Sequence, residues 1–349
     1  LNVCGRILAE DIFADSDLPP FNRSQMDGYA LRASDSQDVP ARLRVVGESK
    51  AGEGWHQVLK EGEAVRIMTG APLPEGADAV QKVEVTREAD GFVEILESVK
   101  PGQFINPLAS EIRNGEMVFS AGQKINKMMI ATLASFGYSK VKVARRPNLA
   151  VLTTGNEIVA VSENPQKDQI RDSNSVTMGE FAADFAEVKS TSVVGDDLES
   201  IKQAILGADA QIIVLTGGVS MGLYDFTKTA LHELGAEIFI EKVQLKPGKP
   251  FVFAKLGDRY MFGLPGNPVS AMVTLLLFVR TAALQMQGAT ETELREGFAV
   301  LSKEMRGPKE RDAYLPAALQ TDERGRLNAL PLRFFGSSDF VSFSRCEAL

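Results

Sequence analysis

The segment 215–228, LTGGVSMGLYDFTK, places the strongest constraint on the fold of this chain. It follows an apolar run, 211–215 (QIIVL), that predicts a buried parallel strand, and it leads into a helical pattern. Between the two lie Thr216, Gly217 and Gly218, a turn that directs backbone N–H groups outward at a helix start, where anions bind. We therefore expect a phosphorylated or oxyanionic ligand here; a simple tight turn is the alternative interpretation.

Composition limits the classes of protein that need to be considered. At 349 residues the chain exceeds the usual size of one domain, and about two to four domains are expected. Its net charge is −8 and no Lys/Arg cluster alternates with aromatic residues, which argues against a nucleic-acid partner. The longest apolar run, 271–279, stops at Arg280 and is too short to span a bilayer, and no signal peptide is visible. We expect a soluble cytoplasmic protein with no membrane partner.

The residues that bind metals or act as nucleophiles are few. Cys4 and Cys346 form no CxxC pair, which excludes a zinc ribbon and fits a reducing compartment. His56 and His232 are the only histidines, so a metal would be held mainly by oxygen ligands, which favours Mg²⁺. There is no GxxxxGK[ST] P-loop and no GxSxG nucleophile elbow. The chain begins at Leu1 rather than Met, and we expect a fragment trimmed at both ends.

The first 145 residues are rich in β-forming segments. Strands are predicted at 43–46, 64–68, 79–85 and 92–96, which suggests a small β-barrel or sandwich, and a helix is predicted at 124–136, with Gly137 as its C-cap and a strand at 140–143 after it. Two polar loops stand out in this region. Asp27 lies in the turn SQMDGYA, and Thr69 lies in the stiff loop MTGAPLPEG. Each can face a ligand, or Asp27 can simply form the turn and the second loop simply join two strands.

From residue 146 strands and helices alternate. Strands are predicted at 148–153, 189–194, 211–215, 237–241, 250–254 and 260–264, and helices at 174–185 (Ser173 as N-cap), 198–206, 226–234 and 269–285. Right-handed crossovers place helices on both faces of such a sheet, which predicts a three-layer α/β domain. The last part, 298–349, has strand-like segments at 298–301 and 314–319 and is predicted to be a small β domain.

Three loops follow predicted strands at their carboxyl ends, where α/β sheets bind ligands. They contain Glu157, the Thr216–Gly218 turn, and Pro265 with Asn267. Glu157 and Asp225 are the nearest carboxylates, and as a pair they could hold Mg²⁺; singly, each is a surface acid or a helix-end charge. In a fourth loop, KPGKP, two prolines and a glycine fix the backbone that carries Lys246 and Lys249, which suits a dianionic oxyanion; a solvated connector is the alternative.

Taken together, these motifs resemble the molybdopterin molybdenumtransferase family, which includes MoeA and the gephyrin E-domain. The resemblance covers nearly the whole chain, with motifs in the family's order. They are SQMDGYA (24–30), IMTGAPLPEGADAV (67–80), LTTGNEI (152–158), IRDSNS (170–175), TGGVSMGLYDFTK (216–228), LKPGKPFVFAKL (245–256) and GLPGNPVSAMVT (263–274).

The resemblance implies a multidomain α/β plus β fold with four domains: a segmented central domain (1–12 and 108–145), a β-rich domain (13–107), an α/β molybdopterin-binding domain (146–295) and a C-terminal β-barrel (296–349), truncated here. It implies a Mg²⁺-dependent transferase that inserts molybdenum from molybdate into adenylylated molybdopterin and releases AMP. The expected protein is a homodimer whose site lies between the α/β domain of one subunit and the β-rich domain of the other. Its further partners would be the molybdopterin adenylyltransferase and recipient molybdoenzymes.

The family's functional residues carry over motif by motif. Asp27 is expected to position or deprotonate a group near the transfer site, with Thr69 and Asp225 as further catalytic residues. Glu157 and Asp225 are the expected Mg²⁺ ligands. Gly217, Gly218 and Ser220 are expected to bind the pterin-nucleotide phosphates, and Lys246, Lys249, Ser270, Arg311 and Ser342 are expected to bind molybdate. Further expected cofactor-binding residues are Thr216, Pro265 and Asn267.

The sequence departs from the family at 106–111, NPLASE, where relatives commonly carry an arginine-rich stretch ending in Gly-Glu-Asp. Only Glu111 keeps the acidic end. The departure leaves two alternatives open beside the transferase: the related molybdopterin adenylyltransferase, which shares the α/β domain, and a catalytically weak paralogue acting as a binding or scaffold protein.

Overall fold

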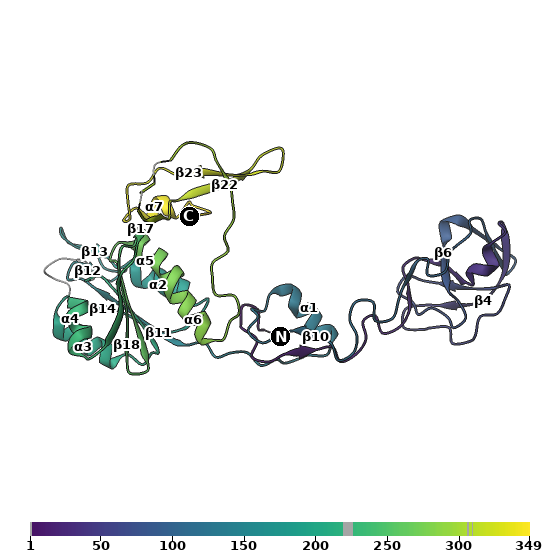
Figure 1. Cartoon of the computed structure of the whole chain (residues 1–349), viewed down its shortest axis with the longest axis horizontal. Coiled ribbons are helices and arrows are strands. Elements are labelled where there is room, and N and C mark those ends of the chain that lie inside the picture. The colour runs from purple at the N-terminus through teal and green to yellow at the C-terminus, as the bar shows by residue number, and fades with distance from the viewer. Residues whose placement is uncertain (1, 219–225, 306, 309) are drawn as a thin grey trace. The chain divides into compact units, whose positions relative to one another are not determined.

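The computed structural model describes residues 2–218, 226–305, 307–308 and 310–349. The chain forms two compact units (Figure 1). The first, the β unit, comprises Glu10–Ser120 and Lys127–Val141; the second, the α/β unit, comprises Asn2–Ala9, Ala121–Asn126 and Lys142–Leu349. The chain therefore passes between the units more than once.

A six-stranded sheet forms the body of the β unit, with strand order β6-β3-β5-β4-β8-β7. Its strands are β3 (Gly28–Leu31), β4 (Ala41–Ser49), β5 (Glu63–Ile67), β6 (Ala79–Lys82), β7 (Thr86–Ala89) and β8 (Phe92–Ile95). Side chains alternate between the faces of a strand. In β3, Tyr29 and Leu31 accordingly pack in one apolar cluster and Ala30 in the other, so all three are buried. The predicted strands at 43–46, 64–68 and 92–96 are confirmed, whereas β6 ends at Lys82 and a 3₁₀ turn, Val83–Val85, follows it.

Short elements complete the β unit. They are β1 (Ile12–Phe13), which pairs with β10 (Met117–Phe119), β2 (Arg23–Ser24), which pairs with β9 (Ile105–Asn106), the 3₁₀ turn Ala33–Ser36, and helix α1 (Lys127–Ser135). Gly137 ends α1 with φ of 73°, and the Tyr138 N–H donates to the Leu133 carbonyl at 2.9 Å, as the predicted C-cap requires. The predicted strand at 140–143 is wrong: only Val143 pairs there, with Leu8.

The α/β unit is built on a second six-stranded sheet, of order β14-β11-β15-β19-β18-β16. Its strands are β11 (Asn148–Thr154), β14 (Glu187–Val194), β15 (Ile212–Thr216), β16 (Glu237–Lys242), β18 (Pro250–Leu256) and β19 (Arg259–Leu264). The pairings β14–β11–β15–β19 are parallel, and β18 is antiparallel to both of its neighbours. All strands but β18 therefore point in one direction, as alternating strands and helices predict.

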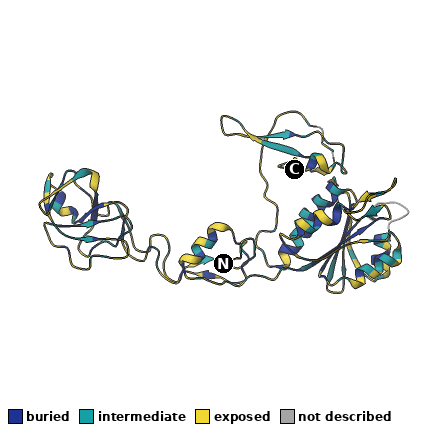
Figure 2. Ribbon diagram, turned by 180° about the vertical axis from the view of Figure 1, so that it is seen from behind, coloured by how far each residue is buried: buried dark blue, intermediate teal, exposed yellow. Residues whose placement is uncertain are grey.

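Helices cover both faces of this sheet, so the predicted three-layer domain is confirmed (Figures 1 and 2). Alternate residues of β11 show why: Leu149 and Val151 pack in the cluster with α2 (Asn174–Ala182), whereas Ala150 and Leu152 pack in the cluster with α3 (Leu198–Gly207). Helix α4 (Phe226–Glu233) lies on the side of α3. A continuous buried strand of this kind is expected when both faces are covered.

The long apolar helix occurs where it was predicted, in three consecutive pieces: α5 (Pro268–Thr274), a π-helical turn (Leu275–Val279) and α6 (Arg280–Met286). The whole stretch, Pro268–Met286, has 19 residues and a mean hydropathy of 1.6, so by length and composition it could cross a membrane. The run 271–279 alone is too short to span a bilayer, as the sequence indicated, but the apolar helix that contains it extends further at both ends. Leu275, Val279 and Ala283 are fully buried against the sheet, as in the core helix of a globular domain.

The C-terminal segment folds onto α5. Its sheet has the order β20-β23-β22, with β20 (Val300–Leu301), β22 (Ala317–Thr321) and β23 (Leu327–Pro331), and helix α7 (Phe340–Phe343) follows. Strand β21 (Asp312–Ala313) pairs instead with β17 (Leu245–Lys246). The strands expected at 298–301 and 314–319 are shorter or shifted along the chain. The described residues here form a small three-stranded sheet, and the barrel stays a prediction.

Candidate functional site

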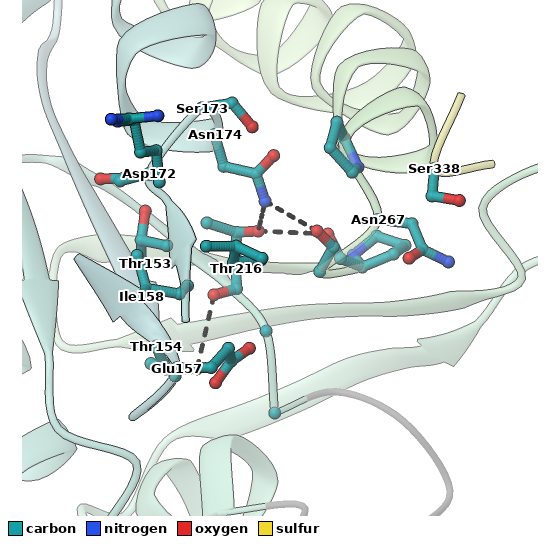
Figure 3. Close-up of a pocket in the computed structure, with 18 of the residues that line it drawn as sticks. Thr153, Thr154, Glu157, Ile158, Asp172, Ser173, Asn174, Thr216, Asn267 and Ser338 are labelled. Carbon is teal, nitrogen blue, oxygen red and sulfur yellow. Dashed lines mark hydrogen bonds between the residues drawn. The ribbon is translucent and has the colours of Figure 1, made fainter. Parts of the chain in front are cut away.

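The loops that follow β11, β15 and β19 meet at the carboxyl edge of the sheet, as the sequence predicted. They surround a cavity of about 930 Å³, which we call the carboxylate cavity (Figure 3). The predicted site residues among its described lining are Glu157, Thr216, Gly217, Gly218, Pro265 and Asn267. Ser220 and Asp225 lie outside the described residues.

A buried asparagine connects these loops. The Asn174 Nδ2 group donates to Thr216 Oγ1 at 3.0 Å and to the Gly266 carbonyl at 2.8 Å, and Thr216 Oγ1 donates to the Pro265 carbonyl at 3.1 Å (Figure 3). Because the Gly266 carbonyl can only accept, the Asn174 amide has one possible orientation. The network therefore ties the start of α2 to the ends of β15 and β19.

The glycine of the central turn is required by close packing. Gly217 has φ of 96°, and a Cβ there would lie 2.5 Å from the Thr154 carbonyl oxygen. The Thr154 hydroxyl in turn donates to the Thr216 carbonyl at 3.4 Å. The turn thus brings bare backbone to the cavity, as an anion-binding loop needs.

Ser173 stands at the N-cap position of α2, but its side chain makes no capping bond. Asp172 performs this role instead, since its carboxylate accepts from the Ser175 N–H at 3.0 Å and from the Ser175 hydroxyl. Asp172 is buried and its charge is compensated locally by these bonds, so it is a structural acid of the cavity.

Two carboxylates of the cavity are less compensated. Burial and the nearby Glu157 charge raise the pKa of Asp196, and Asp196 Oδ1 is buried without a hydrogen-bond partner among the described residues. The Asp196 N–H donates to Asn156 Oδ1 at 3.2 Å, which joins its loop to the loop of Glu157. Two neighbouring acids with an unsatisfied oxygen are a suitable site for a hard cation.

The KPGKP loop lies in a second cavity of about 360 Å³, which we call the lysine cavity. Lys246, Lys249 and Arg311 line it, and its described lining includes no carboxylate. Pro250, Pro265 and Asn267 line both cavities, so the two adjoin. The structure thus brings together the lysines, Ser270 and Arg311, as predicted.

Backbone pairing and packing hold the lysine cavity in place. Parallel pairing of β17 with β21 sets Lys246 opposite Ala313, and it brings Arg311 to the cavity from the C-terminal segment. Gly248 has φ of 118°, and a Cβ there would meet the Thr274 methyl group of α5 at 2.9 Å. The loop therefore packs tightly against the helix that carries Ser270.

Ser342 does not line this cavity. Its N–H and its hydroxyl bind the Asp339 carboxylate, at 3.1 and 2.7 Å, and so cap α7. The serine of the C-terminal segment that lines the cavity is Ser337. Its hydroxyl accepts from Asn267 Nδ2 at 2.8 Å and its carbonyl accepts from the Val269 N–H at 3.1 Å. The structure places Ser337 where Ser342 was expected.

Asp27 and Thr69 meet in the β unit. The Thr69 N–H and hydroxyl both donate to Asp27 Oδ1, at 2.6 and 2.8 Å, and both bonds lower the pKa of this exposed carboxyl group. A carboxylate held in its ionised form is a weak proton acceptor. Of the two roles expected for Asp27, the geometry favours positioning a ligand over deprotonating it.

The divergent 106–111 segment has an arginine beside it. Arg23 of β2 lies opposite Asn106 of β9, and its guanidinium pairs with Glu111 at 3.1 Å. A cation from strand β2 therefore lies beside the segment 106–111.

Asn174, Asp196 and Ser337 were not identified from the sequence. Asn174 lies within the IRDSNS motif, and Asp196 follows the predicted strand 189–194 directly after a glycine, the same pattern that identified the other loops. Only Ser337 carried no distinct signal, since it is one of several serines in the last 15 residues.

Comparison with known proteins gives matches along both units. A family model described as the MoeA N-terminal region (domain I and II) matches residues 1–137, and one described as a probable molybdopterin binding domain matches residues 150–285.

Individual relatives align over most of the chain. A curated molybdopterin molybdenumtransferase from Haemophilus influenzae is 35% identical over 343 residues, covering 97% of this chain and 84% of the relative. One from Staphylococcus epidermidis is 37% identical over 294 residues, covering 82% and 70%. The crystal structure of a molybdopterin biosynthesis MoeA protein from Pyrococcus horikoshii is 32% identical, with a TM-score of 0.76 over 99% of this chain and 86% of that one.

Proposed function

The chain belongs to the molybdopterin molybdenumtransferase family, and from that premise we propose that it inserts molybdenum from molybdate into adenylylated molybdopterin and releases AMP. The reaction is a transfer, in which the pterin dithiolene receives the metal and the adenylyl group leaves.

One observation carries the proposal: the two cavities adjoin and differ in the charge of their linings. The substrates are a pterin nucleotide, whose phosphates need a metal ion and backbone donors, and molybdate, a dianion that needs cations. The carboxylate cavity supplies Glu157, Asp196 and the Gly217–Gly218 turn, and the lysine cavity supplies Lys246 and Lys249. Adjoining cavities allow both substrates to be bound next to each other, which is the requirement for transfer between them.

We include Mg²⁺ as the cofactor. Among the described residues, no group of three or more His, Cys, Asp or Glu side chains is placed so that it could hold a metal ion, so the protein would supply only a few ligands. This fits Mg²⁺, which keeps several waters and binds one or two carboxylates together with phosphate oxygens. Glu157 and Asp196 would hold the ion, because Asp196 Oδ1 is buried without a hydrogen-bond partner among the described residues. Asp225, the other expected ligand, lies outside the described residues, and its role stays a prediction. When bound, Mg²⁺ offsets the negative charge of the phosphates.

The remaining parts of the proposal concern assembly. In a homodimer, Asp27 and Thr69 of one subunit would face the cavities of the other, and Asp27 would orient the substrate as a fixed anion. The C-terminal segment would form part of a β-barrel. The protein would act in the cytoplasm, receive its substrate from a molybdopterin adenylyltransferase and deliver its product to molybdoenzymes.

The test is reconstitution. The protein is incubated with adenylylated molybdopterin, Mg²⁺ and molybdate; AMP is measured by chromatography, and cofactor by activation of an apo-molybdoenzyme. We expect AMP and cofactor to form together and to require molybdate. Absence of both products would refute the proposal, and ATP-dependent adenylylation of molybdopterin by this chain would indicate the adenylyltransferase instead. Asp27→Asn separates the enzyme from a scaffold protein: the enzyme should lose turnover and still bind its ligand, whereas the substitution would have no consequence in a scaffold.

A further inference from the structure

Two large apolar side chains line the carboxylate cavity and are nevertheless exposed. Phe340 is 53% exposed and Ile170 is 58% exposed, and both belong to the cavity lining. Ile170 comes from strand β13 (Ile170–Arg171), which pairs with β12 (Ile158–Val159), and Phe340 begins α7 of the C-terminal segment. Two elements distant in the sequence thus leave apolar surface uncovered in one cavity.

Phe340 is held by a braced turn. The Asp339 carboxylate accepts from the Ser342 N–H at 3.1 Å and from the Phe335 N–H at 3.0 Å, which fixes the start of α7. At the other end of α7, Phe343 is buried against Val269 and Val273 of α5. The helix is therefore anchored to the α/β layer on one side, and Phe340 stays uncovered.

Exposed apolar surface inside a ligand cavity indicates a ligand that covers it. The loops around this cavity supply donors, carboxylates and bare backbone, which suit phosphates and metal ions, and several prolines add apolar surface. Phe340 is the only aromatic side chain in the described lining. A phenyl ring offers a face on which a planar heterocycle can stack, at about 1–3 kcal/mol per base.

On this ground, and resting on the proposed function, we propose that the exposed apolar lining of this cavity, Phe340 and Ile170, which we call the apolar shelf, binds a planar nitrogen heterocycle of the substrate. Both the adenine and the pterin of adenylylated molybdopterin have this chemistry. Phe340 would be a positioning residue: it orients the ring while the glycine turn holds the phosphates.

The test compares ligands that share a phosphate but differ in the ring. Binding of AMP, of molybdopterin and of ribose 5-phosphate, each with Mg²⁺, is measured by titration calorimetry for the wild type, Phe340→Ala and Phe340→Tyr. We expect Phe340→Ala to weaken AMP or molybdopterin by roughly 5- to 150-fold and to leave ribose 5-phosphate unchanged. Phe340→Tyr should retain wild-type affinity, because its ring still stacks.

Phe335→Ala is the matched control. Phe335 lies five residues away in the same segment, is 78% exposed and lines neither cavity. It should bind all three ligands as the wild type does. Ile170→Ala tests the other half of the shelf and should weaken the same ligand by a smaller factor.

Each result decides. A loss confined to AMP assigns the shelf to adenine, and a loss confined to molybdopterin assigns it to the pterin. An equal loss for ribose 5-phosphate, or no loss for either ring-bearing ligand, overturns the inference. If wild-type protein releases AMP in the reconstitution assay while Phe340→Ala binds normally, only this inference fails; if the wild type binds no ligand and releases no AMP, the proposed function fails as well.

Discussion

The two cavities share part of their lining but differ in charge. The carboxylate cavity has Glu157, Asp172 and Asp196 against the single cation Arg171 in its described lining, whereas the lysine cavity has Lys246, Lys249 and Arg311 and no acid. The prolines of the KPGKP loop restrict its backbone, and Gly248 of this loop packs closely against Thr274 of α5. The two adjoining cavities thus present side chains of opposite charge on a shared backbone frame.

The largest effect is expected from the lysine cavity. Replacing both lysines, in Lys246→Ala with Lys249→Ala, removes two of its three cations, and we expect kcat/KM for molybdate to fall roughly 100-fold or more. Lys255→Ala is the control, because Lys255 lies on β18 outside both cavities. An unchanged KM for molybdate in the double variant would contradict the assignment.

The next effect is expected from the carboxylate cavity. Glu157→Gln and Asp196→Asn should each raise the Mg²⁺ concentration needed for half-maximal AMP release by about tenfold, while KM for molybdate stays the same. Asp209→Asn, an exposed acid outside the cavity, should change neither value. If the acid variants raised KM for molybdate as much as the lysine variants do, the two cavities would not be functionally distinct.

The effect of Asp196→Asn on the melting temperature also has an expected direction. Burial and the Glu157 charge raise the pKa of Asp196, so the folded protein destabilises the ionised form at neutral pH. Removing that charge should therefore leave the melting temperature of the metal-free protein equal or higher. A marked fall would show that Asp196 has a structural partner, and the loss of metal binding could then come from misfolding.

A smaller effect is expected from the bonds that join the loops. Asn174→Ala leaves the Gly266 carbonyl and the Thr216 hydroxyl without their donor, which should lower the free energy of unfolding by about 1–3 kcal/mol. Asn114→Ala, an exposed asparagine in the β unit, should be within about 0.5 kcal/mol of the wild type. Urea denaturation measures both, and equal values for the two variants would show that the network does not stabilise the site.

Asp27 lies outside both cavities, and the effect of replacing it on turnover should not depend on pH. The hydrogen bonds from Thr69 lower the pKa of the Asp27 carboxyl group. These bonds therefore stabilise the folded protein at any pH above the ordinary carboxyl pKa of about 4, and this stabilisation is lost only as the pH falls below that value. Asp27→Asn should therefore reduce turnover by the same factor at every pH from 5 to 8. A ratio of wild type to variant that approached one at pH 5 would show that Asp27 titrates as a base.

Much of this architecture was predictable because its signals are local. Buried strands such as β11 and β15 are continuous apolar runs, and the loops at their ends are marked by glycines next to polar residues. The order of the motifs also identified the family. The extra turn at Val83–Val85 and the absence of a strand at 140–143 could not be predicted, because strand ends depend on whether a partner strand lies opposite them.

The sequence by itself determined the candidate binding groups: two lysines in a proline-containing loop, a glycine turn after a buried strand, and an acid in the first loop. Only the tertiary structure decided which of them share a cavity. Asp196 lies near Glu157 because β14 and β11 are parallel neighbours, so the loops at their carboxyl ends lie side by side. Ser337, rather than Ser342, reaches the lysines because Ser342 is used to cap α7. Which side chains line the same cavity depends on contacts between residues far apart in the chain, and the local sequence pattern carries no information about these contacts.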